Sequence, residues 1–303
     1  MKTIITGAFQ ASEEDFDRLR HLGLEITYHK DERQPVDHPE QYEAAICNGL
    51  FLYTPIEEFT NLKYIQLTSA GMDRVPLDYI REHGIIIHNA RGVYSVPMAE
   101  FAVCGVLQLY KQSRFFAENQ HAHKWEKHRG LLELCGKTVC IVGCGSVGTE
   151  CAKRFSAFGC HVTGVDIVPR VDAAYAEIRP MDALDACLTA ADIIVLTLPL
   201  TDDTRHLIDR RTLYSMKQGA ILVNIARGAI VDTDALIAAL GTHLGGAVLD
   251  VFEEEPLDIA SPLWDMENVI LTPHNSFVGE GNMGRLTECV TQNLIRWRVE
   301  YEQ

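Results

Sequence analysis

Short apolar runs without polar alternation recur along the first ninety residues. Five of these runs have the length of a strand, and we expect strands at Thr3–Thr6, Leu24–Tyr28, Ala44–Cys47, Tyr64–Leu67 and Ile85–His88. Amphipathic segments between them predict helices at Glu13–Leu22 and Pro76–His83. Apolar strands separated by helices are typical of a parallel sheet that is buried on both faces. The N-terminal part is therefore predicted to be an α/β sheet domain.

One long apolar helix is expected to follow, starting at Ser95. Serine is a favoured helix-capping residue, and Pro97 suits the first turn, where a missing N–H costs no hydrogen bond. Apolar side chains then continue to Leu109 around much of the helix. A helix with so little polar surface is expected to be buried between domains or between subunits.

A second series of strands and helices begins at Lys137. Its expected strands are Thr138–Val142, His161–Val165, Ile193–Leu196, Ile221–Ile225, Gly246–Leu249 and Val269–Thr272. Six strands with helices between them predict a complete doubly wound sheet. About thirty residues follow His274, including a helix with an apolar stripe at Met283, Leu286, Val290, Leu294 and Trp297. This segment is too short for a domain, so we expect it to pack on the N-terminal sheet.

The predicted fold class is therefore α/β, with two doubly wound parallel-sheet domains. We expect the first domain to comprise residues 1–97 and 275–303, and the second to comprise residues 98–274. The chain then crosses between the domains twice, near Pro97 and near Asn275, which predicts a hinged cleft. With 303 residues the chain is long enough for two hydrophobic cores.

A glycine-rich turn lies between the first strand of the second series and the next helix. It has the pattern GxGxxG and comprises Gly143, Gly145, Ser146, Val147 and Gly148. The first glycine allows a tight turn, the second lets a pyrophosphate approach the backbone, and the third lets the helix pack closely on the strand. N–H groups at the helix N-terminus would bind the phosphates. The turn predicts that residues 98–274 form a dinucleotide-binding domain and that the other domain is the substrate (catalytic) domain.

Asp166 closes the next strand, eighteen residues after Gly148. A carboxylate at this position can accept hydrogen bonds from both ribose hydroxyls and would repel a 2′-phosphate. The cofactor is therefore predicted to be NAD rather than NADP. Arg170 is close in the sequence and would weaken this preference, and a solvated aspartate at a strand end is the alternative interpretation.

The composition limits the partners. The chain has 27 Lys and Arg against 42 Asp and Glu, and this net charge of −15 disfavours nucleic acid and a membrane surface. Nine cysteines without a CxxC pair, and an N-terminus that resembles a strand rather than a signal peptide, predict a reduced cytoplasmic protein. Those beside the glycine turn are predicted to be small core residues, with exposure at the cofactor as the alternative for Cys144. The pair His121 and His123 lacks convergent ligands, so no metal site is expected.

Three residue types that follow predicted strands could perform hydride chemistry on a carbonyl beside a carboxylate. Such a reaction needs a cation for the carboxylate, a proton donor for the carbonyl oxygen, and a group that keeps the donor protonated. Arg227 suits the first role because a guanidinium binds a carboxylate with two parallel bonds, and His274 suits the second. The acidic run Glu253–Glu255 offers the third, but local sequence does not distinguish its members.

The order of these segments resembles the D-isomer-specific 2-hydroxyacid dehydrogenase family along nearly the whole chain. The matching segments are the glycine turn followed by RGAIVD at 227–232, LDVFEEEP at 249–256 and TPH at 272–274. Upstream, LTSAGMDRV at 67–75 and NARGVYSVPMAE at 89–100 look like the family's substrate loop and the start of its interdomain helix. LPLTDDTRHLI at 198–208 looks like a segment of its nucleotide domain.

The resemblance implies a role for each matching residue. It implies Arg227 as the carboxylate binder, His274 as the acid/base and Glu255 as its catalytic partner. It places the substrate carboxylate at the backbone of Ser69, Ala70 and Gly71, and the nicotinamide carboxamide at Asp250. Further cofactor contacts are implied for Pro199, Thr204, Ala226, Arg227 and His274. The family also implies a flavodoxin-like substrate domain beside a Rossmann NAD-binding domain, D stereochemistry and a homodimer.

The predicted function is hydride transfer between NAD(H) and carbon 2 of a small D-2-hydroxy or 2-oxo acid. Glyoxylate or hydroxypyruvate, pyruvate and branched 2-oxo acids all fit, and the sequence does not choose among them. A phosphoglycerate-type activity is less favoured because Asn48–Tyr53 is apolar and aromatic where a phosphate needs a cation. Formate oxidation is disfavoured because that relative pairs its histidine with glutamine. An NAD(H)-sensing corepressor-like protein of the same fold is the alternative, although such proteins usually carry extensions that we do not expect here.

Overall fold

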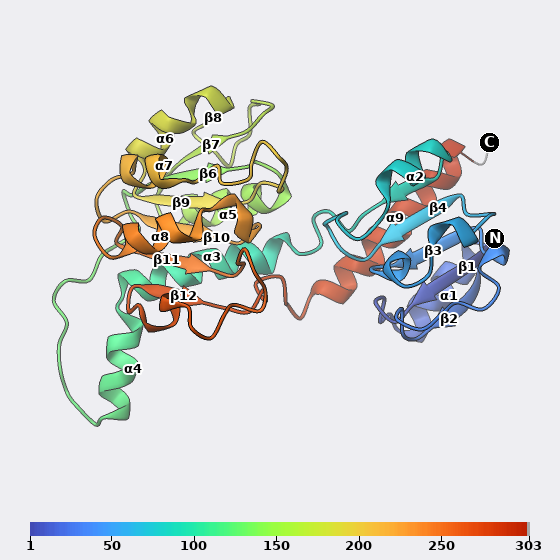
Figure 1. Ribbon diagram of the computed structural model, residues 1–303, viewed down its shortest axis with the longest axis horizontal. Coiled ribbons are helices and arrows are strands. Elements are labelled where there is room, and N and C mark those ends of the chain that lie inside the picture. The colour runs from blue at the N-terminus through green and yellow to red at the C-terminus, as the bar shows by residue number, and fades with distance from the viewer. Residues whose placement is uncertain (302–303) are drawn as a thin grey trace. The chain divides into compact units, whose positions relative to one another are not determined.

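The chain folds into two compact units in the computed structural model, which describes residues 1–301. Unit 1 comprises Met1–Tyr94 with Gly279–Gln303, and unit 2 comprises Ser95–Val278. The boundaries expected from the sequence, after residue 97 and before residue 275, differ from these by three and four residues. Each unit has its own parallel sheet with helices around it, which confirms the α/β fold class (Figure 1).

Unit 1 contains a sheet of five parallel strands in the order β2-β1-β3-β4-β5. The strands are β1 Lys2–Thr6, β2 Glu25–His29, β3 Ala44–Cys47, β4 Tyr64–Leu67 and β5 Ile86–His88. Its helices are α1 Glu13–His21, α2 Leu77–Glu82 and α9 Asn282–Tyr301. Helix α1 begins where Ser12 and Asp15 form a reciprocal capping box. The expectation that every strand is buried on both faces is wrong for β2, which lies at the sheet edge and carries the exposed Tyr28.

Helix α9 packs on the sheet of unit 1, as its apolar stripe predicts. Leu286, Val290, Leu294 and Trp297 are buried, and the Trp297 ring lies 4.7 Å from the ring of Tyr64 on β4. The C-terminal segment thus completes the core of the N-terminal unit. In sequence these two parts are almost two hundred residues apart, so only their apolar periodicity indicates the contact.

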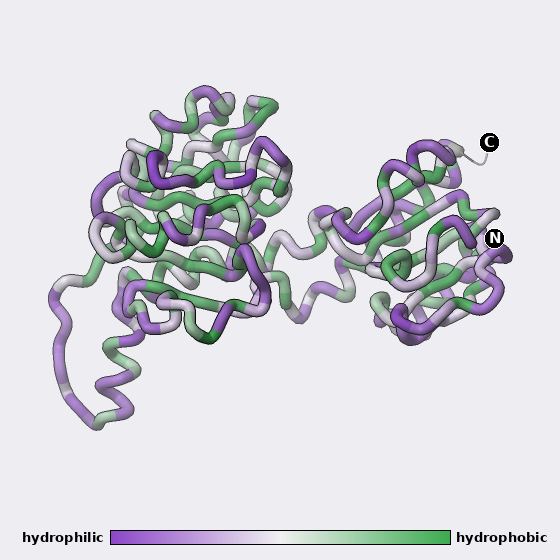
Figure 2. Tube along the Cα trace, viewed as in Figure 1, coloured by the Kyte–Doolittle hydropathy of each residue, from purple (hydrophilic) through white to green (hydrophobic). Residues whose placement is uncertain are grey.

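Unit 2 contains seven parallel strands in the order β12-β11-β10-β9-β6-β7-β8. They are β6 Thr138–Val142, β7 His161–Val165, β8 Glu177–Arg179, β9 Ile193–Leu196, β10 Ile221–Asn224, β11 Gly246–Leu249 and β12 Val269–Leu271. The expectation of six strands is wrong because it omits β8. This three-residue edge strand buries only Ile178, so it has no apolar run to reveal it. The longer central strands are the hydrophobic segments of this unit (Figure 2).

The helices of unit 2 cover both faces of this sheet. They are α3 Ser95–Tyr110, α4 Ser113–His121, α5 Ser146–Ala157, α6 Leu184–Ala190, α7 Arg210–Ser215 and α8 Thr233–Leu240. Helix α3 is buried against β11, where Gly105 lies so close to Val248 that a Cβ at Gly105 would be 2.5 Å from it. Ser95 does not cap α3, because it lies inside the helix and its hydroxyl has no partner among the described residues.

Helix α4 is an element that the sequence pattern did not predict. Gln112 adopts a left-handed conformation with φ of 53°, which ends α3 and starts a separate helix. Helix α4 and the segment after it extend away from the sheet of unit 2 (Figure 1). Short 3-10 turns also occur at Pro39–Gln41, Leu50–Leu52, Ile56–Glu58, Met181–Ala183, Gly228–Ile230 and Pro262–Asp265. Within residues 1–301 none of the helices combines the length and the apolar character that a membrane span requires.

Candidate active site

The glycine turn joins β6 to α5, and two of its glycines lie in close contact with the backbone. Gly143 has φ of +91°, and a Cβ there would lie 2.7 Å from the backbone nitrogen of Leu198. A Cβ on Gly148 would lie 2.2 Å from the carbonyl oxygen of Gly143, so only glycine lets α5 approach the turn. These two glycines are required by the protein's own packing.

Gly145 differs, because a Cβ there would meet no protein atom within 4 Å. Its φ of −72° and ψ of −159° are open to any residue, so neither packing nor backbone conformation requires glycine. Gly145 is the N-cap of α5, and Ser146 and Val147 present the first N–H groups of that helix, which have no acceptor within it. An open position beside free N–H donors fits the pyrophosphate of a dinucleotide.

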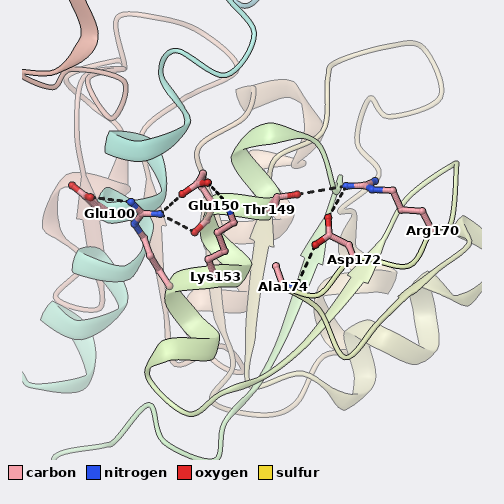
Figure 3. A network of polar contacts seen from close by, with 8 residues as sticks. Glu100, Thr149, Glu150, Lys153, Arg170, Asp172 and Ala174 are labelled. Carbon is pink, nitrogen blue, oxygen red and sulfur yellow. Dashed lines mark hydrogen bonds and ion pairs between the residues drawn. The ribbon is translucent and has the colours of Figure 1, made fainter. Parts of the chain in front are cut away.

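Asp166 follows β7 and reaches back to the glycine turn. Its Oδ2 accepts from the N–H of Cys144 at 2.7 Å and its Oδ1 from the N–H of Val168 at 3.0 Å. A carboxylate has about four lone-pair positions, so two remain for the ribose hydroxyls. Arg170 donates to the carbonyl oxygen of Cys144 and lies 3.5 Å from the Thr149 hydroxyl (Figure 3). The cation that the sequence placed only nearby therefore contacts the glycine turn.

The loop after β9 holds Pro199 and Thr204 together. The Thr204 hydroxyl donates to the carbonyl oxygen of Pro199 at 2.8 Å and accepts from the N–H of Thr201 at 2.7 Å. The two residues that the resemblance assigns to the cofactor thus belong to one braced turn.

The turn that carries Arg227 follows β10. Asn224 is buried at the end of this strand, and its side chain accepts from the N–H of Ala226 at 3.1 Å and donates to the carbonyl oxygen of Arg227 at 3.0 Å. Sequence reasoning missed Asn224, although an amide at the end of an apolar strand was the available signal. Gly228 lies against Phe252, since a Cβ on it would be 1.8 Å from the Phe252 carbonyl carbon. The Arg227 turn is therefore packed directly on the loop after β11.

Glu255 and His274 form an ion-pair geometry at the ends of β11 and β12. The His274 Nδ1 lies 2.9 Å from Glu255 Oε2, and Glu255 Oε1 accepts from the N–H of Phe252 at 3.0 Å. A carboxylate only accepts, so Nδ1 carries the proton of this bond and Nε2 is left for another partner. The side chains are 43% and 37% exposed, so a ligand can reach them. His274 has φ of 52°, in the left-handed region that few residues other than glycine adopt.

The other two glutamates of the acidic run have different surroundings. Glu253 Oε2 lies 2.9 Å from Nε2 of His206, and its Oε1 accepts from the N–H and hydroxyl of Thr233 at the start of α8. Burial alone would raise the pKa of Glu253, but the hydrogen bonds from Thr233 and His206 outweigh it and lower the pKa. Glu254 has no side-chain hydrogen bond or ion pair within residues 1–301. Of the three glutamates, Glu255 is the one whose side chain contacts His274 within the described residues.

Asp250 holds the backbone on both sides of His274. Its side chain is fully buried, with Oδ1 accepting from the Thr272 hydroxyl at 2.6 Å and from the N–H of Asn275 at 2.7 Å. Its Oδ2 accepts from the N–H of Ser276 at 2.9 Å. The protein thus occupies three of the acceptor positions of Asp250, whose implied contact with the nicotinamide stays a prediction.

In unit 1, Ser69, Ala70 and Gly71 form a turn directly after β4. The Ser69 hydroxyl donates to the carbonyl oxygen of Gly71 at 2.9 Å, and the Asn89 side chain donates to the carbonyl oxygen of Ala70 at 2.6 Å. With these carbonyl groups engaged, the turn keeps a fixed shape. Its role in carboxylate binding stays a prediction.

Cys144, beside the glycine turn, is fully buried, and burial raises the pKa of its thiol to about 11. The prediction of a small core residue is confirmed, and the alternative of exposure at the cofactor is wrong. Cys144 faces Gly164, where a Cβ would be 2.4 Å from its sulfur, and so fills the space between turn and sheet. Among the described residues no cluster of three or more His, Cys, Asp or Glu side chains could hold a metal ion.

Comparison with known proteins agrees with this geometry. Residues 103–276 match the NAD binding domain of the D-isomer specific 2-hydroxyacid dehydrogenases. The (S)-sulfolactate dehydrogenase of Chromohalobacter salexigens is 36% identical over a match that covers 80% of this chain and 79% of that protein. The glyoxylate reductase of Thermofilum pendens is 36% identical over a match that covers 78% of this chain and 71% of that protein. The structure of D-lactate dehydrogenase from Aquifex aeolicus, complexed with NAD and lactic acid, superposes with a TM-score of 0.78 at 27% identity, covering 98% of this chain and 95% of that one. This chain therefore belongs to the D-isomer specific 2-hydroxyacid dehydrogenase family of NAD-dependent oxidoreductases.

Proposed function

We propose that this protein interconverts a small 2-oxo acid and the corresponding D-2-hydroxy acid. Glyoxylate, hydroxypyruvate, pyruvate and branched 2-oxo acids are the candidate substrates. The observation that carries the proposal is the pair of Glu255 and His274 at 2.9 Å, exposed at strand ends next to the loop that packs on the Arg227 turn. Acid/base, partner and cation are the three groups that this chemistry needs.

Arg227 binds the substrate carboxylate in this proposal, because a planar guanidinium offers two parallel donors. His274 donates a proton from Nε2 to the carbonyl oxygen during reduction and accepts it back during oxidation. Glu255 stabilises the imidazolium through Nδ1. Bound NADH supplies the hydride for carbon 2. We further propose that the backbone N–H groups of the Ser69–Gly71 turn bind the same carboxylate, since fixed amide donors suit an anion in a chain of net charge −15.

Residues of unit 2 are proposed to hold the cofactor. Gly143, Gly145 and Gly148 with Ser146 and Val147 bind the pyrophosphate, and Asp166 binds the ribose. Pro199, Thr204, Ala226 and Asp250 line the remaining path toward the nicotinamide. A preference for NAD over NADP follows from the charge of Asp166, and Arg170 limits that preference because it contacts the same turn.

Two rival functions predict different behaviour. A corepressor-like sensor would bind NADH without turning over any 2-oxo acid, whereas a phosphoglycerate-type enzyme would need a cation for the phosphate. The exposed and braced His274 favours turnover over sensing, because a binding protein does not require an acid/base.

We also infer a cytoplasmic homodimer. All nine cysteines are free, which suits a reducing compartment. The segment from α4 to Gly136 exposes Phe116, Leu131, Leu132 and Trp125, the last with 99% of its surface, as is typical of an association surface.

Trp125→Ala should weaken association while a surface variant such as Lys153→Ala should not. Light scattering over a range of concentrations checks this; a wild type that stays monomeric at all concentrations contradicts it.

The function is tested with a panel of 2-oxo acids assayed by NADH absorbance. Turnover of glyoxylate, hydroxypyruvate, pyruvate or a branched acid is expected, with loss in Arg227→Ala and His274→Ala. Calorimetry with NADH alone separates the alternatives: tight binding without any turnover supports the sensor. Chiral analysis of the product decides the D assignment.

A further inference from the structure

A cavity of about 470 Å³ lies in unit 1 at the carboxyl ends of β1, β2 and β3. Its lining comes from Ala8 after β1, Lys30–Arg33 after β2, and Gly49 and Tyr53 after β3. The strand order reverses between β1 and β3, and open α/β sheets bind ligands at such a reversal, beyond the carboxyl ends of the strands. The position favours a ligand site.

The acidic groups of this cavity are compensated by the protein itself. Glu32 accepts from the Thr6 hydroxyl at 2.6 Å and from the N–H groups of Asn48 and Gly49, both at 2.7 Å. Asp31 accepts two bonds from the Arg33 guanidinium at 2.9 Å, and this pairing lowers the pKa of Asp31 to about 2. Both carboxylates therefore already have hydrogen-bond or ion-pair partners within the protein.

Two cations in the same lining have no such partner. Within residues 1–301, neither the Lys30 ammonium nor the Arg74 guanidinium makes a side-chain hydrogen bond or ion pair. Arg74 packs close to the loop that follows β3, because a Cβ on Gly49 would lie 3.9 Å from the Arg74 Cδ. Lys30 and Arg74 lie in the lining of one cavity, so both side chains are available there to an external anion.

Arg74 also follows the turn that the proposed function assigns to the substrate carboxylate. Arg74 is three positions after Gly71, so their Cα atoms are at most about 11 Å apart. An extended arginine side chain can span much of that distance. One small molecule can therefore contact both the Ser69–Gly71 turn and the cavity.

We infer that this cavity binds a second oxyanion of the substrate, carried on carbon 3 and contacted by Arg74 and Lys30. The inference rests on the proposed reaction but changes its expected substrate to a 2-oxo acid of the type −OOC–CO–CH2–X, where X is a carboxylate, sulfonate or phosphate ester. The phosphate ester corresponds to the phosphoglycerate-type activity named above as a rival. The apolar stretch Asn48–Tyr53 does not exclude a phosphate from the folded cavity, because the cations of the lining come from other segments. Glyoxylate and pyruvate would then be minor substrates.

The test compares substrates of similar size that differ in charge. Oxaloacetate, sulfopyruvate and 3-phosphohydroxypyruvate are assayed against 4-methyl-2-oxopentanoate, whose branched tail resembles a methylene carboxylate in shape but is neutral. At least one dianion should exceed it at least tenfold in kcat/KM, and the best of the three identifies X. Glyoxylate, which has no carbon 3, serves as the reference for the proposed function.

Variants assign the preference to the cavity. Arg74→Ala should lower kcat/KM for the preferred dianion by roughly 10- to 100-fold, the loss expected for a charged hydrogen bond, and leave glyoxylate unchanged. Lys30→Ala should act in the same direction and Arg74→Lys should restore part of the activity. Arg81→Ala is the matched control, because Arg81 lies in the same unit and is paired with Asp78. Thermal stability should be unchanged, since Arg74 loses no bond.

The outcomes separate the two levels of the proposal. If glyoxylate is reduced but no dianion exceeds the neutral acid, or if Arg74→Ala lowers all substrates equally, the cavity inference is wrong and the function stands. If no 2-oxo acid is reduced at all, both are wrong.

Discussion

The backbone N–H of His274 donates to the carbonyl oxygen of Asp250 at 2.8 Å, while the Asp250 carboxylate binds Thr272, Asn275 and Ser276 around it. One buried residue therefore holds the backbone before and after His274. This arrangement braces the turn in which His274 has its left-handed φ.

Asp250→Ala should destabilise unit 2 and misplace His274. It leaves the N–H groups of Asn275 and Ser276 without their charged acceptor, at a cost of about 1.5–3 kcal/mol each. At about 2–4 °C per kcal/mol for a domain of this size, the melting temperature should fall by roughly 6–24 °C. Thr272→Val, which removes one bond to the same carboxylate, should cost about a third as much. If Asp250 instead acts on the cofactor, KM for NADH rises while the melting temperature hardly moves.

Glu255→Gln should lower kcat/KM for reduction by at least about tenfold, a part of the range expected for a positioned acid/base. Glu255 accepts the Nδ1–H bond that orients the imidazole at 2.9 Å, and an amide carries no charge to stabilise the imidazolium that donates the proton. The Kd for NADH, measured by fluorescence, should hold. A variant with the turnover of the wild type would contradict the assignment.

The neighbouring glutamates are the controls for that experiment. Glu254→Gln should change nothing. Glu253→Gln should leave turnover in place but lower stability, because Glu253 has a pKa below its ordinary 4.5 in the folded protein. A lowered folded pKa stabilises the protein above the unfolded value and loses that contribution as the pH falls through the folded one. The difference in melting temperature between wild type and Glu253→Gln should therefore shrink below about pH 4.

Arg227→Lys should lower kcat/KM by at least ~100-fold, comparable to the loss of one transition-state donor. A point ammonium cannot make the two parallel bonds of a guanidinium. The Kd for NADH, measured by fluorescence, should barely change. Near-normal turnover of the lysine variant would place carboxylate binding elsewhere.

Gly145→Ala and Gly148→Ala should separate cofactor binding from folding. The first places a methyl in open space, so the melting temperature should hold while the NADH Kd rises at least tenfold. The second places a methyl 2.2 Å from the carbonyl oxygen of Gly143 and should lower the melting temperature. An unchanged Kd in Gly145→Ala would remove this turn from the proposed pyrophosphate site.

Asp166→Ala should narrow the preference for NADH over NADPH, because the carboxylate that repels a 2′-phosphate is gone. Arg170→Ala should widen it, because a cation beside the glycine turn is lost. The ratio of kcat/KM values for the two cofactors is the measurement. A wild type with equal values for both would contradict the role of Asp166.

Local patterns of the sequence determined the fold class, most strands, the glycine turn and the chain positions of Arg227 and His274. These features depend on periodicity and on residues within about twenty positions, which a sequence displays directly. The packing of α9 on unit 1 was also predictable, because its stripe had to be buried somewhere. The short edge strand β8 was not, because one buried isoleucine makes no pattern.

Tertiary structure decided which side chains share a site. The sequence alone does not distinguish the three glutamates at 253–255. In the fold, Glu253 contacts His206 and Glu255 contacts His274, whereas Glu254 has no side-chain partner among the described residues. The sequence also does not show that Asp250 is buried. Nor does it show that Lys30 and Arg74 line one cavity, because this depends on which segments the fold brings together. Hydrogen bonds and ion pairs act over about 3 Å in space, so residues 19 or 47 positions apart acquire their roles only when the strands that carry them become neighbours.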